Sequence, residues 1–182
     1  MTLWRDALHG ALAFTAAAGV VFASVAYGEL ALVRALGPIG AYVLWTVSFL
    51  ALGSWFLAPL AGDRVARRRF PMRFCGAFLA YAVLWCVAWV CFPSKLGEWL
   101  GAAVGAGTLG ALIAPRGARP GRPAAACLVF AGNAVGYFIG DALHTALGRP
   151  LGMLLWGATF GIGTGAALGA VIGSGRSVGK EA

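Results

Sequence analysis

Residues 151–173 read LGMLLWGATFGIGTGAALGAVIG and contain no charged side chain. Glycines recur at every fourth position of this run, at Gly157, Gly161, Gly165, Gly169 and Gly173. Because residues four apart are neighbours on a helix, the run predicts a helix with one stripe free of side chains. In water each interior glycine costs roughly 1 kcal/mol relative to alanine. In lipid, small residues let helix backbones approach closely, so the stripe predicts helix packing inside a membrane.

The same spacing occurs in two earlier apolar segments. One set lies at residues 97, 101 and 105, and the other comprises Gly132, Gly136 and Gly140. We therefore expect close helix contacts along much of the second half of the chain.

Composition independently predicts a membrane protein. Hydrophobic residues make up 60% of the chain and charged residues only 11%, against about 25% charged in soluble domains. At 1.5 Å per residue, six stretches are long enough to cross a hydrocarbon core of about 30 Å. The fold class expected is an all-α polytopic bundle, with residues 1–182 forming one transmembrane domain. The six predicted transmembrane helices are residues 10–29, 39–60, 72–92, 96–114, 124–144 and 151–173.

The basic residues predict the orientation of these spans. With six spans, eleven of the fourteen basic residues fall on one side and three on the other. This bias predicts that both termini are cytoplasmic and that the protein is a multi-pass protein of the cell inner membrane. The net charge of +8 then reflects topology and contact with the lipid bilayer, and we expect no nucleic-acid partner. The minority side carries Arg34, Lys95 and Arg149.

A cleaved signal peptide is an alternative for the first span. Arg5 precedes the apolar stretch, and Ser24-Val25-Ala26 resembles a small-residue cleavage site. Cleavage would leave five helices.

A line of polar residues follows one face of the predicted fifth span. Asn133, Tyr137, Asp141 and His144 stand at helical spacing and are interleaved with glycines. An ionisable group inside a span is a candidate functional residue, and Asp141 lies nearest the membrane interior. We expect His144 to be its partner, in a substrate or proton path, with Arg149 as a possible neutralising charge. The alternative is that Asp141 and His144 anchor the helix at the headgroups.

The sequence contains no recognised catalytic motif. It lacks a nucleophile elbow, a zinc-protease motif and a P-loop, and its two histidines fall on opposite sides of the predicted bilayer. We expect no enzyme activity, no metal site and no cofactor.

The loop after the second span reads PLAGDRVARRR, residues 59–69. An acid followed by arginines at a helix junction predicts a cytoplasmic clasp that breaks when the helices move. Its members would be Asp63, Arg64, Arg67 and Arg68. These residues match the signature Gly-x-x-x-Asp-Arg-x-Gly-Arg-Arg, which major facilitator superfamily transporters carry between helices two and three. Pro59 and Ala66 replace its two glycines.

The chain thus resembles the N-terminal six-helix half of a major facilitator superfamily transporter. The resemblance implies a transporter-type half or subunit for a small solute or ion, completed by a second copy or by a membrane partner subunit. The alternatives are a non-transporting scaffold or accessory subunit assembled through the glycine stripes, and the substrate-binding subunit of a vitamin importer.

Overall fold

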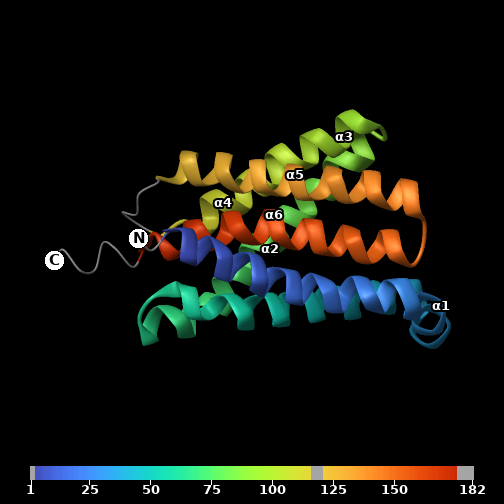
Figure 1. The fold of residues 1–182 in the computed structure, drawn as a ribbon, viewed down its shortest axis with the longest axis horizontal. Helices are drawn as coiled ribbons and strands as arrows, with labels where there is room; N and C mark the ends of the chain where they lie inside the picture. Colours follow the sequence, from blue (N-terminus) through green and yellow to red (C-terminus); the bar gives the residue numbers. More distant parts are fainter. Residues whose placement is uncertain (1–2, 116–120, 176–182) are drawn as a thin grey trace.

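The computed structural model describes residues 3–115 and 121–175, and every regular element in this part of the chain is helical. The prediction of an all-helical chain is confirmed. Figure 1 shows the elements side by side in one bundle. In chain order they are α1 (Leu3–Leu57), η1 (Ala58–Ala61), α2 (Arg64–Cys91), α3 (Lys95–Leu100), the π-helical segment η2 (Gly101–Ala106), α4 (Gly107–Ile113), α5 (Arg122–Leu147) and α6 (Leu151–Gly173).

Five helical stretches within the described residues are long and apolar enough to cross a membrane, judged by length and composition. They lie close to the predicted spans, and the last one coincides with residues 151–173. The two predicted spans nearest the N-terminus both fall within the first stretch. The five stretches are Leu3–Ala61, Arg64–Cys91, Lys95–Ile113, Arg122–Leu147 and Leu151–Gly173.

Helix α1 consists of two arms that meet at Gly37. This glycine has φ 71° and ψ 168°, which is not helical, and Pro38 follows it. A positive φ suits glycine because it has no Cβ. The first arm (residues 3–36) and the second arm (residues 38–57) run back along each other (Figure 1), with the rings of Phe14 and Phe49 5.1 Å apart. A straight helix of 55 residues would be about 80 Å long, far more than a bilayer spans.

The predicted span 96–114 is a rod made of α3, η2 and α4. It packs against α2 through its glycines. A Cβ on Gly101 would lie 3.1 Å from the ring of Trp85, and one on Gly105 would lie 3.0 Å from the carbonyl oxygen of Tyr81. Wide π-type turns occur as local bulges in helices. Here the bulge contains Gly101 and Gly105, two of the glycines that contact α2.

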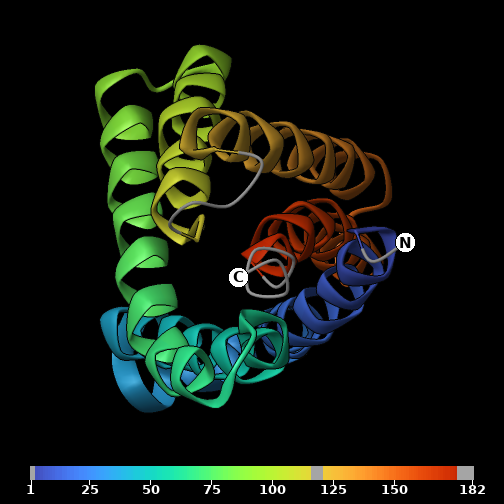
Figure 2. The same ribbon diagram turned by 90° about the vertical axis from the view of Figure 1, so that its left-hand side faces the viewer.

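Helix α6 lies between α5 and the first arm of α1 (Figure 2). Its glycine stripe faces α1, so that a Cβ on Gly161 would lie 2.5 Å from the Cα of Thr15. The glycines of α5 face α6 on another side, and a Cβ on Gly136 would lie 2.5 Å from the carbonyl oxygen of Thr159. Both glycine sets are therefore in contact within a single chain.

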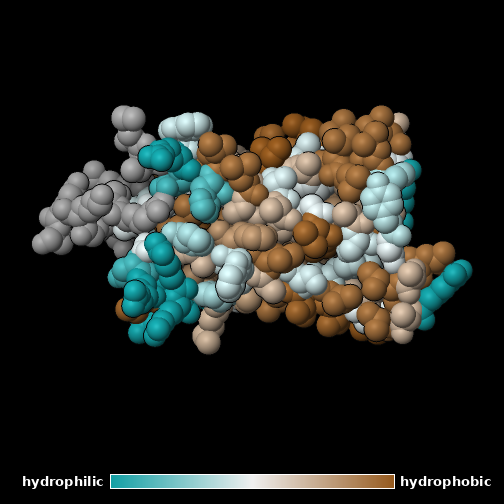
Figure 3. Space-filling view, turned by 60° about the horizontal axis from the view of Figure 1, so that its bottom comes forward, coloured by the Kyte–Doolittle hydropathy of each residue, from teal (hydrophilic) through white to brown (hydrophobic). Residues whose placement is uncertain are grey.

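Large apolar side chains cover the outside of the bundle. Ile39, Trp55 and Met72 are 80%, 76% and 85% exposed. Figure 3 shows polar side chains gathered at the two ends of one face and a mostly apolar surface between them. A surface of this kind suits lipid rather than water, so the protein is membrane-embedded.

We predict that Gly165→Ala destabilises the protein, because the new methyl group would collide with the backbone carbonyl of Gly10. Overpacking of this kind costs about 1–3 kcal/mol. Thermal unfolding in detergent measures the loss.

Gly76→Ala is the matched control, since a Cβ there meets nothing within 4 Å and Gly76 also lies inside a helix. We expect it to be neutral or slightly stabilising. If both substitutions change the thermal stability equally, α1 and α6 can move apart at Gly165 at little cost in free energy.

Candidate functional site

The polar residues predicted on one face of α5 lie in three different environments. Asn133 is fully buried, and its Nδ2 donates hydrogen bonds to Tyr81 Oη at 3.4 Å and Thr164 Oγ1 at 3.3 Å. These three residues, here called the polar cluster, join α2, α5 and α6. Within the described residues the Oδ1 of Asn133 has no hydrogen-bond partner. A buried amide with an unused acceptor is a costly feature in an apolar bundle.

Tyr137 lies one turn further along α5, within a group of aromatic side chains. Its ring centre is 4.8 Å from that of Trp85 and 5.4 Å from that of Trp156. These rings come from α2, α5 and α6, the same three helices that form the polar cluster. They separate the cluster from the end of the bundle at which α5 finishes.

Asp141 forms an ion pair at that end, with a residue that sequence reasoning did not assign to it. Lys95 Nζ lies 2.8 Å from Asp141 Oδ2 and 2.8 Å from Glu98 Oε2, so two carboxylates share one ammonium. We call Lys95, Glu98 and Asp141 the outer ion cluster. It connects α3 to α5.

The expected partners of Asp141 lie elsewhere. Arg149 pairs with Glu29 instead. The ring of His144 lies 5.4 Å from that of Trp156, and its Nδ1 is buried without a hydrogen-bond partner among the described residues. The predicted pairs of Asp141 with His144 and with Arg149 are therefore replaced by the pair with Lys95. Helical spacing places the polar residues on one face of α5, but it does not specify which helix or loop packs against that face.

The predicted clasp residues also take a different arrangement. Asp63 is the N-cap of α2 and accepts a hydrogen bond from the backbone N–H of Ala66 at 2.7 Å. Arg67 Nε donates to the carbonyl oxygen of Gly62 at 3.0 Å. Asp63 forms no ion pair with Arg64, Arg67 or Arg68 in the part of the chain that the structure describes. An N-cap carboxylate stabilises a helix by about 1 kcal/mol, so Asp63 has a local structural role here.

A cavity of about 920 Å³ lies at the opposite end of the bundle from the outer ion cluster. The start of α2, the end of α4, the start of α5 and the end of α6 enclose it. Among the described residues, its charged lining consists of Asp63, Arg69, Arg73 and Arg122. We call this the basic cavity. The sequence predicts these arginines only as topology signals, and no local spacing brings Arg122 close to Arg69 and Arg73.

Arg73 fixes one wall of the basic cavity. Its Nε donates to the carbonyl oxygen of Leu112 at 3.0 Å, and its Nη2 donates to that of Ala114 at 2.5 Å. These acceptors end α4, where carbonyl groups lack helical partners. The arginine thereby joins α2 to α4.

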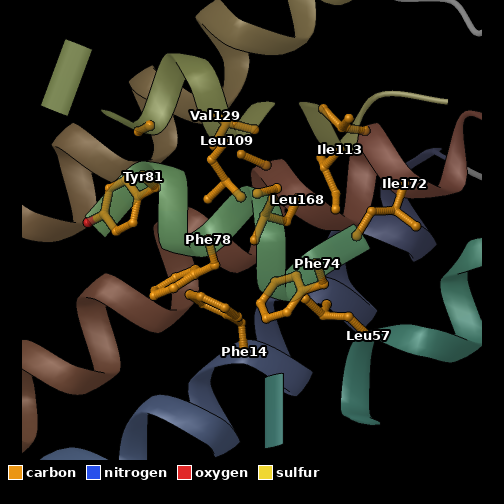
Figure 4. Close-up of a cluster of buried hydrophobic side chains, with 14 of the residues drawn as sticks. Phe14, Leu57, Phe74, Phe78, Tyr81, Leu109, Ile113, Val129, Leu168 and Ile172 are labelled. Atoms are coloured by element: carbon orange, nitrogen blue, oxygen red, sulfur yellow. The ribbon is translucent and has the colours of Figure 1, made fainter. Parts of the chain in front are cut away.

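A buried apolar layer lies between the basic cavity and the polar cluster, and Figure 4 shows its side chains packed together. On α5 and on α6, an apolar residue of the layer stands between the residue that lines the cavity and the residue of the polar cluster. Along α5, Arg122 is followed by Val129 and then by Asn133, whereas along α6 Leu168 lies between Ile172 and Thr164. The layer is fully buried and comprises Phe74, Leu109, Val129 and Leu168.

Comparisons with protein-family models, with curated proteins and with solved structures found no match to this chain. The resemblance of residues 59–69 to a major facilitator signature stays a prediction from the sequence. What the structure defines is a helical membrane bundle with a basic cavity at one end, a buried polar cluster in the middle and an ion cluster at the other end.

We predict that Lys95→Gln destabilises the protein more than Asp141→Asn does. The first change leaves Glu98 and Asp141 without their shared cation, whereas the second leaves Lys95 paired with Glu98. The difference should be about 1 kcal/mol or less, because the Lys95 side chain is 65% exposed. Thermal unfolding in detergent at low and high salt measures it, and salt should reduce it.

Arg34→Gln serves as the control, since it removes a basic residue of the same predicted side that has no ion pair within residues 3–115 and 121–175. Equal destabilisation by Lys95→Gln and Asp141→Asn would contradict the shared-cation arrangement.

Proposed function

We propose that the chain crosses the cell inner membrane six times, with both termini in the cytoplasm. The two arms of α1 would cross separately, because the backbone reverses direction at Gly37. The start of α1 and the end of α6 lie together, since a Cβ on Gly173 would meet the side chain of Asp6. An even number of crossings is required when both ends lie on one side. The concentration of arginines at this end supports its cytoplasmic placement.

We further propose that the protein is a transporter-type subunit for a small solute or ion. The observation that carries this proposal is the order of layers along the bundle. A cavity of about 920 Å³ lies at the basic end, and a buried apolar layer separates it from the polar cluster. A transport pathway with one closed gate has this arrangement, because solute must reach polar groups near the middle without a continuous water path.

The helix contacts indicate which parts would move. Helix α6 approaches α1 and α5 most closely at glycines, where backbone lies against backbone. Helix α2 meets α1 through phenylalanine rings: Phe49 and Phe78 are 5.0 Å apart, and Phe14 and Phe74 are 6.4 Å apart. Rings can change rotamer as helices slide. We propose that α2 and α4 move against α1 and α6, and that this motion opens the apolar layer.

In the scaffold alternative the glycine stripes serve only assembly. The glycines of α5 and α6 contact helices of the same chain, which favours the transporter proposal over a scaffold joined to another subunit through them. We retain homo-oligomerisation as part of the transporter proposal, because two copies with both termini cytoplasmic would lie parallel in the membrane.

The topology can be tested with reporters at two positions. We predict that a reporter at the C-terminus reads as cytoplasmic and that one inserted at Gly37 reads as periplasmic. Gly37 tolerates an insertion sterically, since a Cβ there meets nothing within 4 Å. The same reading at both positions would contradict the six-crossing topology.

The pathway can be tested by thiol labelling without knowledge of the solute. In a background without native cysteines, we predict that the Thr164→Cys variant reacts slowly with a membrane-impermeant maleimide. Thr164 is fully buried beyond the apolar layer, so the reagent can reach it only when the layer opens. Labelling from each side of oriented vesicles, quenched at intervals, gives the rate. The native cysteines to replace are Cys75, Cys86, Cys91 and Cys127.

Two control variants bracket this measurement. Val65→Cys lies in the basic cavity at a residue that is 58% exposed, and it should react rapidly from the cytoplasmic side. Ala17→Cys is fully buried in α1 and should not react from either side. If Thr164→Cys is as unreactive as Ala17→Cys, the apolar layer does not open and the transporter proposal fails.

A further inference from the structure

We infer that the basic cavity is a binding site for a phosphate ester. As the substrate class of a transporter, this inference rests on the proposed function, but as a binding site it can be tested without any transport measurement. A soluble phosphorylated molecule and an anionic phospholipid headgroup both present a phosphate ester, and this group fits the site. The experiment below distinguishes these two sources.

The charges that line the basic cavity favour an anion. Three arginines line it against a single carboxylate within the described residues, and that carboxylate caps α2 through the N–H of Ala66. Arg69 and Arg73 stand four residues apart on the same face of α2, and Arg122 opens α5 across the cavity. Arginine side chains on two helices can therefore approach one ligand from different directions. Their planar guanidinium groups match phosphate oxygens in pairs.

Backbone dipoles add to this positive potential. Helix α5 begins at Arg122, which lines the cavity, whereas the first turn of α2 is already capped by the carboxylate of Asp63. The N-terminus of a helix carries a partial positive charge and unpaired N–H groups, which favour bound anions. The opposing dipole at the end of α4 is offset by Arg73, which donates to the carbonyl oxygens of Leu112 and Ala114.

The shape of the cavity indicates an organic ligand rather than a bare ion. Its volume of about 920 Å³ lies within the range of sites for small organic molecules, which is roughly 300–1,000 Å³. Phe70, Ile113 and Ile172 supply apolar lining beside the charged groups. A ligand with an ester-linked phosphate and a short carbon body satisfies both features. Basic pockets between membrane helices on the cytoplasmic side also suit phospholipid headgroups.

The test uses the purified full chain with two probes that share one headgroup. Glycerol 3-phosphate is the soluble probe, titrated by calorimetry against protein in neutral detergent, with glycerol as the uncharged control. Phosphatidylglycerol is the lipid probe, measured by native mass spectrometry of protein released from nanodiscs of phosphatidylcholine doped with it. We expect at least one phosphate probe to bind with one-to-one stoichiometry, and glycerol not to bind.

Charge-matched variants locate the site. We expect Arg69→Gln and Arg122→Gln each to weaken binding about tenfold, the size of one lost charge-assisted contact. Arg68→Gln is the control, because it removes the same charge from the neighbouring position of α2 but does not line the cavity. It should change affinity less than twofold. All three arginines are exposed, so unfolding temperatures without ligand should stay the same.

Each result has a defined meaning. Binding of glycerol 3-phosphate alone identifies a soluble ligand, and binding of phosphatidylglycerol alone identifies a lipid. Binding of neither probe, or equal weakening by Arg68→Gln and Arg69→Gln, overturns the inference. If neither probe binds but the Thr164→Cys variant is labelled slowly, the transporter proposal still holds, for another class of solute. If a phosphate probe binds but the Thr164→Cys variant is not labelled, the basic cavity is an anion-binding site without a role in transport.

Discussion

The whole bundle depends on the direct approach of helix backbones at the glycines of α6. Lipid tails are as apolar as leucine, so apolar burial does not hold membrane helices together, and van der Waals packing must do so. Packing is strongest where side chains are absent, as at Gly161 beside Thr15 and at Gly136 beside Thr159. Because α6 is approached in this way from two sides, it fixes where α1 and α5 lie. All other elements are positioned relative to these three helices.

The same helix contacts determine where the buried polar groups lie. The polar cluster spans α2, α5 and α6, so it joins α2 to the two helices that pack against each other through glycines. The basic cavity likewise has walls from α2 and α4 on one side and from α5 and α6 on the other. The polar cluster and the basic cavity therefore both lie between α2 on one side and α5 and α6 on the other. A relative movement of α2 would change them together.

Much of the fold could be predicted from local sequence. The absence of charge and the spacing of Gly157 to Gly173 specify α6 to the residue, and the span 96–114 differs from the observed Lys95–Ile113 by one position at each end. These features depend on helical period and on the length needed to cross lipid, which a sequence contains directly. The break at Gly37 lies between the predicted spans 10–29 and 39–60, although the first arm continues as a helix beyond residue 29.

The candidate site could be predicted only in part, because its contacts join residues far apart in the chain. Helical spacing placed Asn133, Tyr137 and Asp141 on one face, but nothing local pairs Asp141 with Lys95 across 46 positions. Asp63 stands before a helix, which suits a cap as well as it suits a clasp, and only the observed bond to Ala66 decides between them. The arginines of the basic cavity were seen as topology signals, since charge bias and ligand binding use the same residue type.

The position of α6 has a consequence for how the protein is made. It is synthesised after α1 and α5, yet it fills the space between them and contacts the backbones of both. Until it emerges from the ribosome, Gly10 on one side and Gly132 on the other face lipid or each other without their final neighbour. The contacts of α6 with Gly10 and Gly132 can therefore form only after α1 and α5 have been synthesised.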